Sequence, residues 1–64
     1  MKYQLTYDDT QWSVWEVTDD LLKEREIASS DIFMYVHWEQ YSDPNGSKQN
    51  WKWITKEEAF LKCL

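Results

Sequence analysis

The side chains best able to do chemistry are a single histidine, His37, and a single cysteine, Cys63. Nucleophilic catalysis needs a base positioned beside an activated Ser or Cys, and the sequence contains no nucleophile elbow, phosphate-binding loop or paired-acid motif. One His and one Cys are also too few nitrogen and sulfur ligands for a tetrahedral zinc site. We therefore expect a protein that is not an enzyme and that uses no metal or cofactor.

The aromatic content of the chain is its more distinctive feature. The sequence has five Trp, four Tyr and two Phe, and each aromatic side chain can bury on the order of 150–250 Å². This suits a chain of 64 residues, because a domain of that size buries only roughly 60% of the surface that its unfolded chain exposes. Although the mean hydropathy is -0.81, this many aromatic residues predict a folded chain. We expect one domain over residues 1–64.

The whole chain has a net charge of -5, and its acidic residues are concentrated in the first half. Residues 8–31 contain eight acids and two basic residues, a balance of -6, whereas residues 44–64 contain four Lys and two Glu, a balance of +2. Because the first region would repel a phosphate backbone, direct binding to nucleic acid is disfavoured.

The acidic stretch has two interpretations. The ordinary one is a solvated face that keeps the protein soluble. The alternative is mimicry, in which spaced carboxylates imitate a row of phosphates and occupy the basic groove of a nucleic-acid-handling protein. The residues that would form such a row are Asp8, Asp9, Asp19, Asp20, Glu24 and Asp31.

The first half of the chain predicts a hairpin followed by a helix. Alternating residues over 2–7, a turn-like segment over 8–11 and strand-forming residues over 12–17 indicate the hairpin. Thr18 offers a capping hydroxyl, two acids follow it, and the next residues are good helix formers. This predicts a short helix over 19–28, with a strand over 25–29 as the alternative.

A second hairpin is predicted around the sequence Asp43-Pro44-Asn45-Gly46. Residues 32–41 are β-branched and aromatic, and residues 51–54 resemble a return strand. Pro favours the first position of a type I turn and Gly favours the left-handed residue of a G1 bulge. Such a three-residue loop would make the numbers of paired residues sum to 90.

This register would gather aliphatic and aromatic side chains on opposite faces. Helices would cover the aliphatic face, which would carry Ile32, Met34, Val36, Trp38 and Ile54. An open aromatic face would mark an interaction site. Its predicted binding residues are Tyr35, His37, Tyr41, Trp51 and Trp53. In the alternative, the first hairpin covers these rings with Trp12 and Trp15 to form the core of a small barrel.

A C-terminal helix is predicted over residues 56–64. Thr55 and Glu58 have the spacing of a capping box. The helix is expected to bury Ala59, Phe60, Cys63 and Leu64. The predicted fold is therefore α+β: a small antiparallel sheet of two hairpins, about four strands, with one short middle helix and a C-terminal helix packed on one face.

The leading functional hypothesis is a small acidic protein that binds another protein, as a stoichiometric inhibitor or adaptor. Its aromatic face would anchor a basic, nucleic-acid-handling partner, and its acids would steer the encounter. The alternatives are a module that stacks on nucleic-acid bases or another small ligand, and a self-associating homodimer.

Size, charge and composition add a resemblance and a location. In size and charge alone, the chain is similar to the small acidic inhibitors that phages and mobile elements make against host defence or repair proteins. That resemblance identifies no functional residue. The absence of an apolar leader or membrane span, together with the unpaired Cys63, predicts a cytoplasmic protein with no membrane partner.

Overall fold

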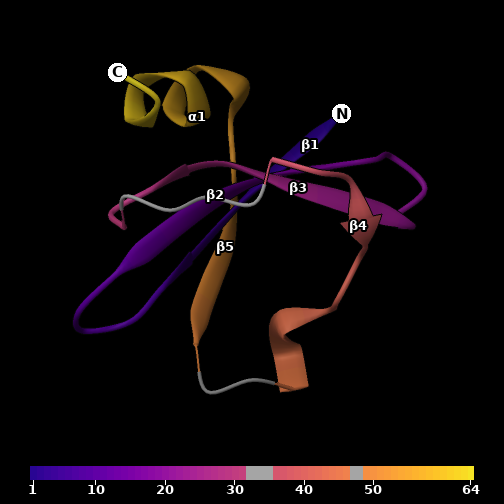
Figure 1. Cartoon of the computed structure of the whole chain (residues 1–64), viewed down its shortest axis with the longest axis horizontal. Helices are drawn as coiled ribbons and strands as arrows, with labels where there is room; N and C mark the ends of the chain where they lie inside the picture. The colour runs from indigo at the N-terminus through magenta and orange to yellow at the C-terminus, as the bar shows by residue number, and fades with distance from the viewer. Residues whose placement is uncertain (32–35, 47–48) are drawn as a thin grey trace.

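The computed structural model describes residues 1–31, 36–46 and 49–64. Its described part is an antiparallel sheet of five strands with one C-terminal helix, an α+β arrangement (Figure 1). The sheet order is β4-β3-β2-β1-β5, so β1 lies between β2 and β5. The elements are β1 (Lys2–Tyr7), β2 (Trp12–Val17), β3 (Lys23–Ser29), β4 (Glu39–Gln40), the 3-10 turn η1 (Pro44–Gly46), β5 (Asn50–Ile54) and α1 (Lys56–Lys62).

The predicted first hairpin is confirmed. β1 and β2 pair antiparallel, with Leu5 opposite Val14 and Tyr7 opposite Trp12. The carboxylate of Asp8 closes the turn by accepting hydrogen bonds from the amides of Thr10 and Gln11. These bonds hold the pKa of Asp8 below its usual range, and they fix the register of the hairpin.

The predicted helix over 19–28 is wrong, and the alternative strand is found as β3. β3 pairs with β2, with a bulge between Val14 and Trp15. The residues that suggested a helix cap close a turn instead: Thr18 Oγ1 accepts from the amide of Lys23, and Asp20 Oδ1 accepts from the amide of Leu22. Short polar side chains such as those of Thr and Asp can bond to nearby backbone groups either at the start of a helix or in a turn. A strand forms here because residues 19–28 contain too few apolar side chains to give a helix a face that could be buried.

The predicted second hairpin is also wrong. β4 pairs with β3, with Glu39 opposite Glu24, and β5 pairs with β1. The sequence around Pro44 forms the 3-10 turn η1 rather than a hairpin loop. A tight local loop would leave one edge of β1 unpaired, whereas the longer connection lets β5 fill that edge. The part of the predicted strand over residues 32–35 lies outside the described residues.

The C-terminal helix is confirmed over Lys56–Lys62, as is its cap. The hydroxyl of Thr55 accepts a hydrogen bond from the amide of Glu58. The expected burial is confirmed for Ala59 and wrong for Phe60, Cys63 and Leu64, which are exposed. The helix touches the sheet through this small residue and through an edge-to-face contact between Phe60 and Tyr3.

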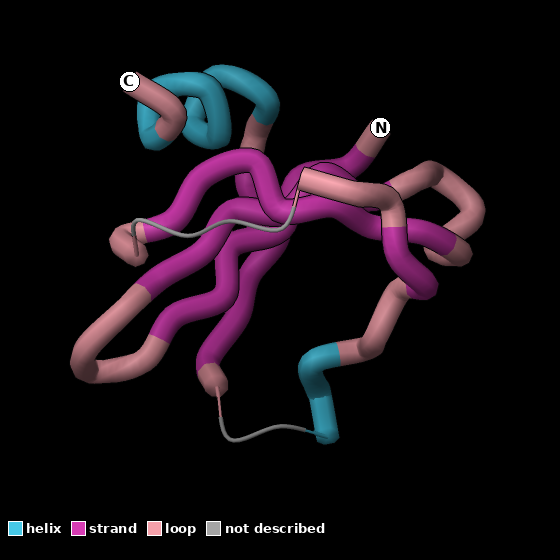
Figure 2. The backbone as a smooth tube through the Cα atoms, in the orientation of Figure 1, coloured by secondary structure: helices cyan, strands magenta, loops and turns pink. Residues whose placement is uncertain are grey.

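The core lies on the face of the sheet that α1 covers, here called the helix face. Its buried members are Tyr3, Leu5, Val14, Ala28 and Ala59, with Trp12, Ile27 and Ile54 packed against them. Polar contacts continue across this face, where Arg25 pairs with Glu16 and its guanidinium lies over the ring of Trp38. The turn η1, which follows β4, lies on the other side of the sheet (Figure 2).

Leu21, in the turn between β2 and β3, has a left-handed backbone with φ of 60°. This conformation disfavours residues with a Cβ atom by roughly 1–2 kcal/mol. We expect Leu21→Gly to be more stable than Leu21→Ala by about 1 kcal/mol, measured as the free energy of unfolding in urea. At the neighbouring Leu22, whose backbone is not left-handed, Leu22→Ala should be more stable than Leu22→Gly. If the Ala variant were more stable than the Gly variant at both positions, the left-handed backbone at Leu21 would be contradicted.

A candidate protein-binding cleft

The opposite face of the sheet, here called the cleft face, carries side chains that are polar and yet buried. Gln4 and Thr6 of β1 are 1% and 6% exposed, and Trp15 of β2 lies opposite Gln4. β5 adds Trp51 opposite Thr6 and Trp53 opposite Gln4. A buried polar face is stable only when its groups are hydrogen-bonded, so its bonds determine how its aromatic rings are oriented.

Two hydrogen bonds fix aromatic rings against this face. The indole N–H of Trp15 donates to the hydroxyl of Thr6 at 2.9 Å. The side-chain amide of Gln4 donates to the hydroxyl of Tyr41 at 3.2 Å. The second bond joins β1 to the connection that follows β4, and it therefore holds that connection over the cleft face.

A carboxylate pair stands at the β3–β4 end of this face. Glu24 is 8% exposed and lies directly opposite Glu39. One oxygen of Glu24 accepts a hydrogen bond from the amide of Ser42 at 2.8 Å. Burial raises the pKa of Glu24 above its usual range, the Ser42 amide acts to lower it, and Glu39 raises it further. Like charges placed opposite each other on neighbouring strands destabilise a sheet.

These groups line a cleft of about 260 Å³. Three carboxylates border it, those of Glu24, Glu39 and Asp43, and none of the described residues that line it is basic. The remaining lining residues are Gln4, Thr6, Trp15, Gln40, Ser42, Pro44 and Gln49. The cleft therefore combines negative charge, amide and hydroxyl groups, and one indole wall.

The structure brings together three of the five predicted aromatic binding residues. Trp51 and Trp53 form an edge-to-face pair with ring centroids 5.8 Å apart, and Tyr41 joins the same face through Gln4. Trp51 is half-buried and donates to Asn45, whereas Trp53 is 40% exposed. His37 is exposed in the segment before β4, and Tyr35 lies outside the described residues.

The predicted acidic residues are divided between two ends of the sheet. Asp8 and Asp9 lie in the β1–β2 turn, and Asp31 follows β3 at the same end, where the amide of Ser30 bonds to Trp12. Asp19 and Asp20 lie in the β2–β3 turn at the other end (Figure 1). Of the six, Glu24 is the one that lines the cleft.

Sequence reasoning missed Trp15, Glu39 and Asp43 as site residues. A signal for Trp15 was present, because a turn over residues 8–11 pairs residues whose numbers sum to 19 and so places Trp15 opposite Gln4. No comparable local signal existed for Glu39, since its pairing with Glu24 depends on β3 being a strand.

Two further features of the described residues bear on function. Among them, no group of three His, Cys, Asp or Glu side chains is placed to hold a metal ion. No helix in the described ranges is both long and apolar enough to cross a membrane.

Comparison with known proteins gives no relative: the chain matches no protein-family model, no curated protein and no solved structure.

The raised pKa of Glu24 makes a prediction about stability. The protonated form is favoured in the folded state, so stability should fall as pH rises from the ordinary Glu pKa through the raised folded value. At neutral pH, Glu24→Gln should raise the free energy of unfolding by roughly 0.2–1 kcal/mol, the range for relief of an opposed like-charge pair. The advantage of the variant should shrink as pH is lowered through this window.

Asp9→Asn is the matched control for this experiment, because it removes the same charge from an exposed turn residue. Subtracting the control removes the general effect of net charge on stability. A difference between Glu24→Gln and the parent chain that stays constant with pH, or that follows the control, would contradict a buried, opposed carboxylate at position 24.

Proposed function

We propose that this protein binds a basic protein partner and that the cleft receives an Arg or Lys side chain of that partner. The observation that carries the proposal is the placement of buried Glu24 directly opposite Glu39, at the wall of a cleft also lined by Asp43 and Trp15. Carboxylates that repel one another in the free protein would be relieved by a bound cation. This favours a cation as the ligand of the cleft.

The size of the cleft favours a side chain of a larger partner over a free small molecule. Pockets for small molecules are roughly 300–1,000 Å³, whereas this cleft is about 260 Å³. A single extended side chain can fill a space of this size while its backbone stays outside. Guanidinium suits this chemistry better than ammonium, because its planar fork pairs with carboxylates in a bidentate manner and stacks on an indole such as that of Trp15.

Stability supports a functional reason for the carboxylates. A buried carboxylate facing another disfavours folding, and a small domain has little stability to spare. Positions that reduce stability without a structural benefit are typical of binding sites. Glutamine could accept the same hydrogen bond from Ser42, so hydrogen bonding alone does not require Glu at this position.

The surroundings of the cleft fit an encounter with a basic surface. Acids at both ends of the sheet contribute to the net charge of -5, and a negative charge accelerates association with a basic partner at low salt. Trp53, at the other side of the cleft face, leaves part of its ring exposed. Tyr and Trp contribute strongly to protein interfaces, so this ring would extend the contact beyond the cleft.

An NMR titration with N-acetyl-arginine amide tests the proposal, with the uncharged citrulline derivative as its isosteric control. Arginine should shift the indole N–H of Trp15 and the amide of Ser42, which flank the cleft, and citrulline should leave both in place. Glu24→Gln combined with Glu39→Gln should weaken the arginine effect at least tenfold, because two charged hydrogen-bonding partners are removed. Equal shifts with both ligands would contradict the cation-binding role.

Asp9→Asn combined with Asp31→Asn is the matched control, since it removes the same total charge far from the cleft. It should reduce binding only slightly, and high salt should abolish that small effect. If this control weakens arginine binding as much as the cleft variant does, the ligand responds to net charge and the cleft has no specific role.

A further inference from the structure

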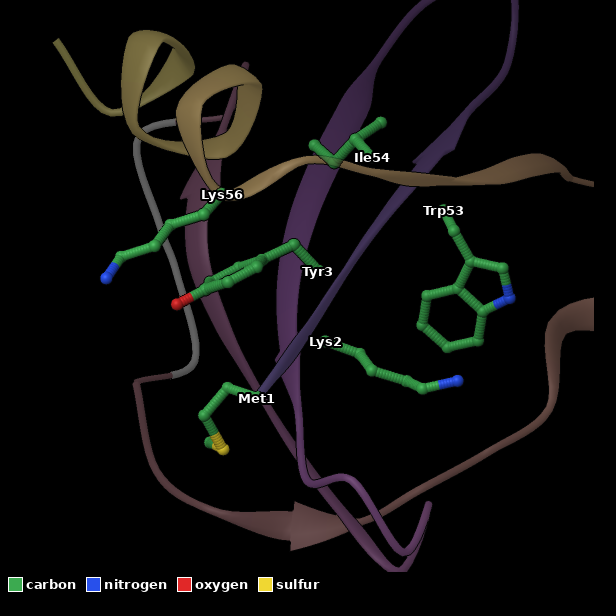
Figure 3. Close-up of a pocket in the computed structure, with 6 residues that line it drawn as sticks. All are labelled: Met1, Lys2, Tyr3, Trp53, Ile54 and Lys56. Carbon is green, nitrogen blue, oxygen red and sulfur yellow. The ribbon is translucent and has the colours of Figure 1, made fainter.

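A second pocket lies at the end of the sheet where β1 begins and β5 leads into α1. It is open, has a volume of about 450 Å³, and is lined by Met1, Lys2, Tyr3, Trp53, Ile54 and Lys56 (Figure 3). Its volume falls within the range of roughly 300–1,000 Å³ that small-molecule sites occupy. In contrast to the cleft, its charged lining residues are both lysines.

The walls of this pocket combine apolar and polar groups in similar proportion. The indole of Trp53 lies on one side of β1 and the ring of Tyr3 on the other, with Ile54 above them and Met1 below (Figure 3). Trp53 keeps 40% of its surface exposed. A planar ring placed in this space could therefore stack against an indole that is already held by its edge-to-face contact with Trp51.

The two lysines of the pocket carry charge that no described carboxylate neutralises. Lys2 Nζ lies 5.0 Å from the ring centroid of Trp53, and Lys56 Nζ lies 5.5 Å from that of Phe60. The ion pairs of the described residues join Arg25 to Glu16 and the amino group of Met1 to Asp19. A cation held over an aromatic face keeps its full charge, so both ammonium groups remain able to attract an anion.

The negative net charge of the chain acts only weakly at this pocket. Lys2 begins β1 and Asp8 follows its end, so the acids of the β1–β2 turn lie about 20 Å away, at about 3.3 Å per residue. This exceeds two Debye lengths at physiological salt, each about 8 Å. Asp19 is nearer, but it is engaged with the amino group of Met1 at 2.9 Å. Glu57 and Glu58 follow Lys56 in α1, so Lys2, held at the Trp53 ring, is the cation that attracts an anion to the indole.

From these features we infer that the pocket binds a small aromatic anion. The planar ring of the ligand would stack on the exposed part of the Trp53 indole, and its carboxylate or phosphate would pair with Lys2. Figure 3 shows Lys2 on the same side of β1 as Trp53, and Lys56 on the other side with Tyr3, so Lys2 is the ammonium group that an anion beside the indole would meet. This pocket shares no lining residue with the cleft, although Trp53 also belongs to the partner contact proposed above, and the inference does not depend on that function.

Calorimetric titration with 2-naphthoate tests this inference, with 2-naphthamide as the neutral control of the same shape. The carboxylate should bind at least fivefold more tightly than the amide, and adenosine monophosphate should bind if the site accepts nucleotides as well as aromatic carboxylates. Lys2→Gln should weaken naphthoate binding roughly fivefold, as loss of one near charge at a solvated surface predicts. Acetate, which lacks a ring, should bind at least tenfold more weakly than naphthoate.

Lys52→Gln is the matched control, because Lys52 lies on β5 opposite Leu5 and therefore on the helix face, outside the pocket. It should leave naphthoate binding within twofold of the parent chain. Trp53→Leu should abolish binding while thermal unfolding reports whether the variant is folded, and the Trp53 indole N–H of the parent chain should shift on titration. Equal binding of the amide and the carboxylate, or equal effects of Lys2→Gln and Lys52→Gln, would overturn the inference.

Discussion

Pairing of β1 along both of its edges is the constraint on which the rest of the structure depends. β2 reaches one edge through a tight turn, and β5 reaches the other from the far end of the sequence. This central position buries both faces of β1: Tyr3 and Leu5 enter the apolar core, whereas Gln4 and Thr6 are buried among polar and aromatic groups. Because a buried amide and hydroxyl must be hydrogen-bonded, they recruit Tyr41 and Trp15 and so build the floor of the cleft.

The two faces of the sheet therefore serve different purposes. The helix face buries few residues, and its aromatic side chains extend the small core. The cleft face contains a polar network in which buried groups are satisfied within the described part of the chain. Glu24 is the exception in energetic terms, because its hydrogen bond to Ser42 does not offset burial and the opposing Glu39. The unfavourable burial of the Glu24 carboxylate opposite Glu39 is the feature on which we base the proposed binding of a cation.

Local sequence patterns were sufficient to predict those elements whose hydrogen bonds join residues close together in the chain. The Asp8 turn and the Thr55 cap each depend on contacts within three residues, and both were predicted. β3 was mistaken for a helix because its alternation consists of Glu24, Glu26 and Ala28, so that its buried positions look polar. The partner of β5 could not be predicted, since pairing with β1 brings together residues nearly fifty positions apart.

In the candidate site too, local patterns could be predicted and long-range pairing could not. Period-two alternation correctly placed Trp51 and Trp53 on one side of a strand, but the face they share is built by β1, not by residues 36–41. Trp15 entered the site through the register of the first hairpin, whereas Glu39 entered it only through the pairing of β4 with β3. Of the predicted acids, Glu24 is the one that lines the cleft, and its burial is a property that charge patterning in a sequence does not show.

The most direct test of this account is an NMR pH titration that follows the backbone amide of Ser42. Its proton is bonded to the Glu24 carboxylate, so its chemical shift should change as that carboxylate is protonated, with a midpoint above the ordinary range for Glu. In Glu24→Gln the same amide should show no such transition. A transition at the ordinary Glu pKa, or one that persists in the variant, would contradict a buried Glu24 held in the wall of the cleft.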